Sequence, residues 1–215
     1  QYKDEFINQI YKFNSTRIDP IIIDGGSNIG LSLLYFKTLY EESRIISFEP
    51  DPEIFKILQD NVKNNKLEKI SLHQKGLGIE NCDIFFKQDG MAGGSVNMKG
   101  SGIEIKMVRL SEYINEPIDF LKLNIEGLEN DVIQELFTSK KIQNINEMVI
   151  EYHGFPYLNQ TLGDILKILD KSNFRYLIHD FDDETCETTK PPFRLKNDDK
   201  WYCLIYAKNK NNPIN

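Results

Sequence analysis

Three short segments of this sequence carry polar residues whose types and spacing could hold a ligand and move a proton. The first, residues 24–30, reads Asp-Gly-Gly-Ser-Asn-Ile-Gly, and the carboxylate Glu49 follows it one helix and one strand later. The second, residues 122–126, alternates polar and apolar side chains, and the third, residues 151–153, contains an acid and a histidine. Carboxylate, amide and imidazole groups bind hydroxyls, transfer protons and ligate cations, so these segments indicate an enzyme site.

The turn at residues 24–30 joins a predicted strand to a predicted helix, and its glycines let the backbone pass close to a ligand. A dinucleotide-binding turn would have glycine at position 27, where this chain has Ser27, and Asp24 would repel a pyrophosphate. A cationic ligand suits the turn better. S-adenosylmethionine carries a sulfonium and an ammonium, and an acid about 4 Å away attracts such a charge by roughly 1 to 4 kcal/mol.

Glu49 supports the same interpretation, because a carboxylate at the end of the second strand can accept hydrogen bonds from both hydroxyls of a ribose. Taken singly, Asp24 is equally well explained as a helix cap or turn former, and Glu49 as a solvated acid at a strand end. Their joint position after successive strands favours the cofactor. The predicted cofactor-binding set is Asp24, Gly25, Gly26, Ser27, Asn28, Gly30, Glu49, Pro50, Gly76 and Leu77.

The later segments supply candidates for catalysis. Lys122, Asn124 and Glu126 share one face if the strand persists that far, and Glu151 and His153 share the parity of the next strand. We expect His153 to act as general base, with Glu126 and Glu151 orienting it or binding the acceptor. The structural alternatives are an internal salt bridge between Lys122 and Glu126 and a histidine satisfied within the core.

The acceptor contacts are predicted from the remaining polar and aromatic side chains. Lys122, Ser95 and Tyr152 are the candidates, with Tyr152 able to stack on a sugar. Ser95 ends a glycine-rich stretch, residues 90–95, which reads as a lid over the substrate or as a simple hairpin tip. A second version of the mechanism uses a divalent cation, magnesium or manganese, held by Asn124, Glu151 and His153.

The elements that must position these residues alternate between strand and helix. Apolar runs predict strands at residues 20–24, 44–48, 70–74, 119–124, 147–152, 176–179 and 202–207, and helical spacing predicts helices near 30–39, 51–62, 129–137 and 162–169. Residues 83–87 and 104–109 alternate like the strands of an inserted β-hairpin. The pattern predicts an α/β fold with a doubly wound, mostly parallel sheet, whose ligands bind at the carboxyl ends of the strands.

Four ordered motifs resemble the FkbM-type methyltransferases. They are Ile-Ile-Asp-Gly-Gly-Ser-Asn-Ile-Gly at 22–30, Phe-Glu-Pro-Asp at 48–51, Asp-Phe-Leu-Lys-Leu-Asn-Ile-Glu-Gly at 119–127 and Ile-Glu-Tyr-His at 150–153, so that the resemblance spans residues 21–153. It implies a Rossmann-like class I methyltransferase fold, S-adenosylmethionine as cofactor, and methylation of a hydroxyl group of a sugar, glycan or related natural product. The chain departs from the family pattern at Asn124, where the family normally has Asp.

Composition limits the remaining possibilities. The 215 residues, 40% hydrophobic, suffice for one domain at 20–207, preceded by an N-terminal helical extension at 1–19 and followed by a frayed tail at 208–215. A net charge of −7 argues against nucleic-acid substrates. No apolar run approaches the roughly 18 residues that cross a membrane. Three scattered cysteines indicate a reducing compartment, the cytoplasm, and the first residue is Gln, which is compatible with a domain of a longer polypeptide.

Two other functions share these sequence features. An NAD-type oxidoreductase has the same β-α-β arrangement and an acid after the second strand, although Asp24 and Ser27 argue against it. A catalytically decayed nucleotide-binding module would explain Asn124, although Glu126, Glu151 and His153 argue for an active site. The S-adenosylmethionine-dependent O-methyltransferase is therefore the function that we expect.

Overall fold

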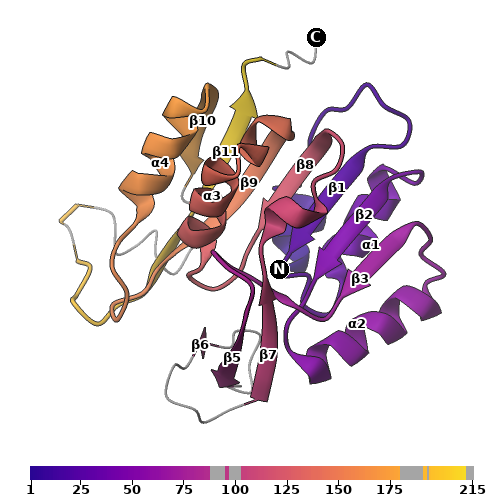
Figure 1. The fold of residues 1–215 in the computed structure, drawn as a ribbon, viewed down its shortest axis with the longest axis horizontal. Helices are drawn as coiled ribbons and strands as arrows, with labels where there is room; N and C mark the ends of the chain where they lie inside the picture. The colour runs from indigo at the N-terminus through magenta and orange to yellow at the C-terminus, as the bar shows by residue number, and fades with distance from the viewer. Residues whose placement is uncertain (88–94, 97–102, 180–190, 193, 212–215) are drawn as a thin grey trace.

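A computed structural model describes residues 1–87, 95–96, 103–179, 191–192 and 194–211, with residues 86–87 and 95–96 described by their backbone alone. Its centre is a seven-stranded sheet (Figure 1). In order across the sheet the strands are β10 (Phe174–His179), β11 (Trp201–Asn209), β9 (Ile145–Gly154), β8 (Ile118–Leu123), β1 (Ile21–Gly25), β2 (Arg44–Phe48) and β3 (Ile70–His73). The strands from β9 to β3 pair in parallel, and β11 runs antiparallel to both β9 and β10.

Helices cover both faces of this sheet, as the predicted doubly wound fold requires. Helices α3 (Glu129–Thr138) and α4 (Leu162–Lys171) pack on one face, and α1 (Leu31–Leu39) and α2 (Pro52–Asn64) on the other (Figure 1). The β-branched run of β1 shows how one strand serves both cores. Ile21 and Ile23 belong to the cluster on the α3 side, while Ile22 belongs to the cluster on the α1 side. The predicted α/β architecture is confirmed.

A second, smaller sheet is inserted between β3 and β8, with strand order β4-β7-β5-β6. Its strands are β4 (Gly76–Leu77), β5 (Cys82–Lys87), β6 (Ser95–Val96) and β7 (Ile103–Val108). The predicted hairpin is the antiparallel pair β5 and β7, which projects beyond the central sheet in Figure 1. The parallel pairing of β4 with β7 was not predicted, because two residues are too few to show a periodic pattern.

The first residues of the chain join the core instead of standing apart from it. A short π-helix, η1 (Lys3–Ile7), leads into Tyr11 and Phe13, which are 3% and 4% exposed. Phe13 stacks on Phe120 of β8, with ring centroids 4.6 Å apart. At the other end of the domain, Asn209, which was expected to fray, completes β11. Its side chain donates hydrogen bonds to the carbonyl oxygens of Gln143 and Ile145, at 3.3 and 3.2 Å.

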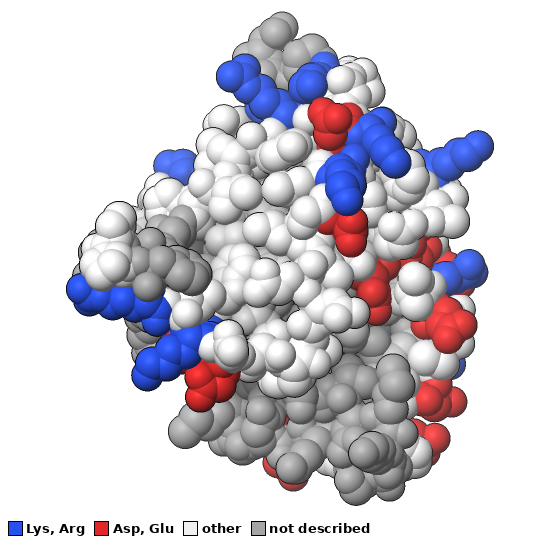
Figure 2. Space-filling view, turned by 90° about the vertical axis from the view of Figure 1, so that its left-hand side faces the viewer, with Lys and Arg blue, Asp and Glu red and all other residues white. Residues whose placement is uncertain are grey.

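The edge of the sheet at β10 carries exposed apolar side chains, those of Tyr176, Leu177 and Ile178. Figure 2 views the molecule from this side and shows uncharged side chains over the centre of the face, with Lys and Arg side chains toward its margins. The described part of this face therefore presents no continuous basic surface. None of the described helices has the length and hydropathy needed to cross a membrane.

Helix α2, which borders the site, begins at a residue whose side chain caps it. Asp51 is its N-cap and accepts hydrogen bonds from the backbone N–H groups of Glu53 and Ile54, at 2.8 and 3.1 Å. Replacing Asp51 with Ala should lower the free energy of unfolding by about 1 kcal/mol, because two N–H groups lose their acceptor. Urea denaturation measures the change. Asp60→Ala, an exposed position within the same helix, is the control and should change stability by less than about 0.5 kcal/mol.

Candidate active site at the carboxyl ends of the strands

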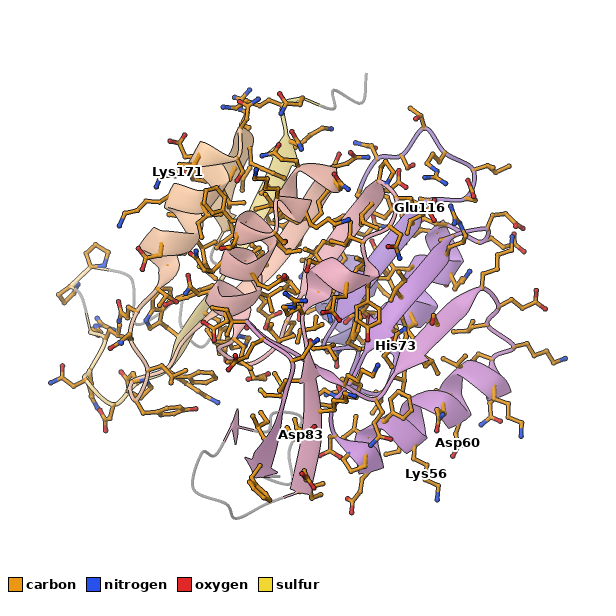
Figure 3. All side chains as sticks on the ribbon, viewed as in Figure 1. Lys56, Asp60, His73, Asp83, Glu116 and Lys171 are labelled. Carbon is orange, nitrogen blue, oxygen red and sulfur yellow. The ribbon has the colours of Figure 1, made fainter. Side chains whose placement is uncertain are left out.

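A cavity of about 310 Å³ lies where the parallel strands end. Its walls come from the segments after β1, β2, β8 and β9, from β4, and from the N-terminal segment. In Figure 3, His73 marks the carboxyl end of β3, and Glu116, just before β8, lies toward the opposite edge of the sheet. The position agrees with the general rule for parallel α/β sheets.

The structure brings about half of the predicted site residues to this cavity. Those that line it are Gly26, Asn28, Glu49, Pro50, Gly76, Leu77, Asn124, Glu126 and Glu151. Those that lie behind its wall are Asp24, Gly25, Ser27, Gly30, Lys122, Tyr152 and His153. The predicted lid at residues 90–94 and the side chain of Ser95 lie outside the described residues. Residues that the motifs did not indicate also line the cavity, among them Glu5 and Tyr11.

The turn after β1 is shaped by its contact with the segment after β8. Gly26 has a φ of +81°, and a Cβ added there would lie 1.8 Å from the carbonyl oxygen of Asn124. Only glycine fits, since a side chain would meet backbone. The turn then directs the backbone N–H of Asn28 to Glu49, whose Oε2 accepts it at 2.9 Å. The two cofactor motifs are thereby joined by a direct hydrogen bond.

Glu49 is held with its carboxylate at the cavity wall. Its Oε1 accepts a second hydrogen bond, from the backbone N–H of Asp51 at 3.0 Å, and the residue is 7% exposed. Burial raises the pKa of Glu49 to about 7, although the two N–H donors act in the opposite direction. Each carboxylate oxygen has two acceptor sites, so both can still accept a hydroxyl proton.

Asp24, predicted to bind the cofactor, and Lys122, predicted to bind the acceptor, form a buried ion pair with each other. Lys122 Nζ lies 2.8 Å from Asp24 Oδ1, and the side chains are 2% and 0% exposed. Ser32 donates a hydrogen bond to the other oxygen of Asp24 at 2.5 Å. Neither Asp24 nor Lys122 lines the cavity. The alternative salt bridge between Lys122 and Glu126 was wrong, because Glu126 follows the end of β8 with a φ of +55°.

A cluster of carboxylates surrounds His153 behind the cavity wall. Its Nδ1 lies 3.0 Å from Glu129 Oε1, and its Nε2 lies 3.7 Å from Glu126 Oε2 and 3.8 Å from Glu151 Oε1. Sequence reasoning missed Glu129, which is 1% exposed and begins α3. The signal that could have found it is an acid in the first helical turn directly after the Glu-Gly-Leu of residues 126–128.

Glu129 is fixed by backbone as well as by the imidazole. Its Oε1 accepts hydrogen bonds from the backbone N–H groups of Ile125 and Gly127, at 3.2 and 3.1 Å. These bonds hold its carboxylate in place beside the ring. The segment after β8 thus closes around one buried carboxylate, and this carboxylate orients the ring of His153.

The carboxylates decide the charge of His153. Burial alone would lower the pKa of His153, but the hydrogen bond and charge of Glu129, with the charges of Glu126 and Glu151, outweigh it and raise the pKa to about 9. At neutral pH the ring therefore carries a proton on each nitrogen. A doubly protonated ring neither accepts a proton as a base nor ligates a metal. Among the described residues, no group of three or more His, Cys, Asp or Glu is arranged to hold a metal ion. The predicted set of Asn124, Glu151 and His153 includes an amide and stays a prediction.

Glu151 is the member of this cluster that reaches the cavity. Its Oε2 accepts a hydrogen bond from Asn124 Nδ2 at 3.0 Å and lies 3.5 Å from the hydroxyl of Tyr11, which also donates to it. Burial raises the pKa of Glu151. A carboxylate with a raised pKa accepts a proton more readily than an ordinary one, which makes Glu151 the best-placed proton acceptor.

Tyr152, predicted to contact the acceptor, does not line the cavity. The side chain is 2% exposed and packs beside Trp201, with ring centroids 5.4 Å apart. Its hydroxyl oxygen accepts a hydrogen bond from the backbone N–H of Thr161 at 2.9 Å. Tyr152 lies on the opposite face of β9 from Glu151 and His153, because successive side chains of a strand point to opposite faces.

Acidic side chains dominate the wall of the cavity. Among the described residues that line it, the acids are Asp4, Glu5, Glu49, Asp51, Glu126 and Glu151, and the only Lys or Arg is Lys75. Such a wall attracts a cation and repels a polyphosphate. The acidic wall supports the predicted preference for a cationic ligand. Asp24, on which that prediction rests, does not contribute to it, because Lys122 neutralises its charge.

Comparisons with known proteins agree with this fold and this set of motifs. The family model of the methyltransferase FkbM domain matches residues 24–176, and the chain belongs to this family. It is 30% identical over 165 residues to Methyltransferase 1 of Beauveria bassiana and 25% identical over 177 residues to Methyltransferase sdnD of Sordaria araneosa. The alignments cover 63% and 62% of this chain and 66% of each relative, so the chain spans just under two thirds of either protein.

The solved structure of methyltransferase FkbM from Methylobacillus flagellatus KT has the same fold. It matches 95% of this chain with a TM-score of 0.61 and 17% sequence identity, and the match covers 47% of that protein. The predicted resemblance and the Rossmann-like class I fold are confirmed. An FkbM-type methyltransferase is a transferase, which sets aside the NAD-type oxidoreductase as the class of this chain.

The charge of His153 can be measured directly. We expect its imidazole to titrate near pH 9 in NMR spectra, while His73, whose pKa burial lowers, titrates below 6.5 and serves as the internal reference. Glu129→Gln should lower the pKa of His153 by about 1 or more, because the nearest negative charge is lost. The control is Glu116→Gln, which removes the same charge at the opposite edge of the sheet. Titration of His153 near 6.5 in the unaltered protein would contradict the charged ring.

Proposed function

We propose that the cavity binds S-adenosylmethionine and that the protein transfers its methyl group to a hydroxyl oxygen of a sugar or related polyol. The observation that carries the cofactor assignment is the acidic wall of the cavity, with six carboxylates and one lysine among its described residues. S-adenosylmethionine brings two positive charges and one carboxylate, whereas NAD brings a pyrophosphate. Electrostatic attraction therefore favours the first cofactor.

The residues of the cavity fit the parts of this cofactor in an order set by the strands. Glu49, at the end of β2, would accept hydrogen bonds from the ribose hydroxyls, and Gly76 and Leu77 of β4 would border the adenine. The turn at Gly26 and Asn28 would border the amino-acid part, since it lies at the neighbouring strand β1. This assignment uses the strand order alone and supports a single, extended position for the cofactor.

The chain's own residues must position the acceptor hydroxyl and receive its proton. When bound, S-adenosylmethionine supplies the methyl group: the C–O bond forms as the C–S bond breaks, and the electron pair of that bond stays on sulfur. Glu151 would receive the hydroxyl proton, because it is the carboxylate of the His153 cluster that lines the cavity. Holding the two reacting groups in line can itself contribute on the order of 7 kcal/mol, so positioning matters as much as the base.

His153 would act through Glu151. As a charged ring 3.8 Å from Glu151 Oε1, it stabilises the ionised carboxylate that is needed before transfer. Glu129 would hold the ring in place through Nδ1. This arrangement keeps His153, Glu126 and Glu151 in the proposed catalytic group but gives the proton transfer to Glu151. No step requires a metal.

Support for a hydroxyl acceptor comes from the family resemblance and from the polar groups beside Glu151. The hydroxyl of Tyr11 and the amide of Asn124 both contact Glu151 Oε2. They offer hydrogen-bond donors and acceptors of the kind that bind polyols. Asn124 donates to Glu151 where the Asp usual at this position would repel it, so the departure from the family pattern is compatible with activity.

Calorimetric titration tests the cofactor. S-adenosylmethionine should bind with a dissociation constant in the micromolar range, with or without manganese, and NAD should not bind. Glu49→Gln should weaken binding of S-adenosylmethionine about 10-fold or more, because hydrogen bonds to a charged carboxylate contribute about 1.5 to 3 kcal/mol. Glu53→Gln, an exposed position in the first turn of α2, is the matched control. Absence of S-adenosylmethionine binding in the unaltered protein would refute the proposed function.

Turnover tests the role of Glu151. The assay measures release of S-adenosylhomocysteine in the presence of monosaccharides and sugar alcohols. With an acceptor that supports turnover, Glu151→Gln should lower kcat about 100-fold or more, because the proton acceptor is lost. Its affinity for S-adenosylmethionine should change less than threefold. A variant that keeps full kcat would exclude Glu151 as the proton acceptor.

A further inference from the structure

The N-terminal segment forms one wall of the cavity with residues that the family motifs do not include. Asp4, Glu5, Ile10 and Tyr11 all line it, and the family model begins only at residue 24. Phe13 stacks on Phe120 and anchors the segment to the sheet. These residues are therefore held against the cavity by the core of the same domain, and their side chains belong to the site.

Glu5 is the unusual member of this wall. It is 1% exposed, and its Oε1 accepts a hydrogen bond from Gln1 Nε2 at 3.0 Å. No hydrogen-bond donor among the described residues reaches its Oε2, which is fully buried. Burial raises the pKa of Glu5 to about 7. A buried carboxylate without a full set of partners is unfavourable, and the cavity that it borders is where a partner could come from.

The nearby charges of the protein do not remove this imbalance. Lys122 lowers the pKa of Glu5 and Asp24 raises it, and Lys122 also binds the carbonyl oxygen of Gly26 in the turn after β1. Glu5 lines the same cavity as Gly26 and Asn28 of this turn. The ammonium of Lys122 is already bonded to Asp24 and to the carbonyl oxygen of Gly26, at 2.8 Å each. The N-terminal ammonium of Gln1, which also lowers the pKa of Glu5, lies 3.3 Å from Asp4 Oδ2. Among the described residues, no Lys, Arg or His forms an ion pair with Glu5.

We propose that Glu5 binds the α-ammonium group in the amino-acid part of S-adenosylmethionine and of its product. The inference rests on the proposed function, because Glu49 at β2 would hold the ribose and the turn after β1 would border the amino-acid part. Glu5 lines the same cavity as that turn. An ammonium group there gains a charged acceptor, and the carboxylate gains an ion-pair partner. The N-terminal segment is then part of the cofactor site and is stabilised by the cofactor.

Two ligands distinguish binding of the α-ammonium group by Glu5 from a general effect of Glu5 on the cavity. S-adenosylhomocysteine contains the α-ammonium group, whereas 5′-methylthioadenosine has the same nucleoside and sulfur without the amino-acid part. Calorimetric titrations of the whole chain measure the two affinities. Glu5→Gln should weaken binding of S-adenosylhomocysteine about 10-fold or more, and it should change the affinity for methylthioadenosine less than twofold. Glu68→Gln makes the same substitution at an exposed residue that does not line the cavity, and it should change either affinity less than twofold.

The outcomes distinguish failure of this inference from failure of the proposed function. An unchanged affinity of Glu5→Gln for S-adenosylhomocysteine, or an equal loss for both ligands, would overturn the role of Glu5. If neither ligand binds to the unaltered protein, the proposed function itself fails. Binding of methylthioadenosine to the variant also shows that the variant is folded.

Thermal unfolding gives a second readout. Without ligand, Glu5→Gln should unfold at the same or a higher temperature than the unaltered protein, because a buried charge has been removed. Its stabilisation by S-adenosylhomocysteine should be smaller. A lower unfolding temperature of the ligand-free variant, together with an unchanged stabilisation by S-adenosylhomocysteine, would show that Glu5 serves the fold and would overturn the proposal.

Discussion

The buried ion pair between Asp24 and Lys122 is the interaction on which the rest of the site depends. The two residues are direct partners in the parallel register of β1 and β8, and Lys122 also binds the carbonyl oxygen of Gly26. This fixes the turn that directs Asn28 to Glu49. Removing one partner of a buried pair leaves the other charge uncompensated and typically costs about 3 to 5 kcal/mol. The pair therefore organises the site without itself lining the cavity.

The architecture was predictable because its causes are local. The β-branched run at Ile21, Ile22 and Ile23 and the capping sequence at Asp51 each determine an element within a few residues. The partners of the polar residues were not predictable in the same way. Lys122 meets Asp24, 98 positions away, only because β8 lies beside β1, and alternation along one strand had suggested Glu126. The N-terminal segment reaches the cavity through packing of Phe13, which carries no motif.

The cluster around His153 shows why residue type alone misassigned the base. An isolated histidine has the pKa of a general base, but three carboxylates near the ring raise the pKa to about 9. Because the pKa in the folded protein exceeds the ordinary value of 6.5, the stabilisation is fully present below pH 6.5 and is lost as the pH rises through 9. The difference corresponds to about 3 kcal/mol. The ring thus contributes to folding at the pH where it cannot act as a base.

The buried acids of the cavity destabilise the fold when they are ionised, whereas the charged ring of His153 stabilises it. Burial raises the pKa of Glu5 and Glu49 to about 7, so the ligand-free protein binds more protons than the unfolded chain between pH 4.5 and 7, and its stability falls as the pH rises through that interval. A site that holds carboxylates out of water at such a cost is arranged for a ligand that supplies positive charge and hydroxyl donors. A cation that restores favourable contacts to these acids is bound by groups already in position, so little binding energy is spent on ordering them. The cost of burying these carboxylates and the attraction that they would exert on the proposed cationic cofactor therefore have the same physical origin.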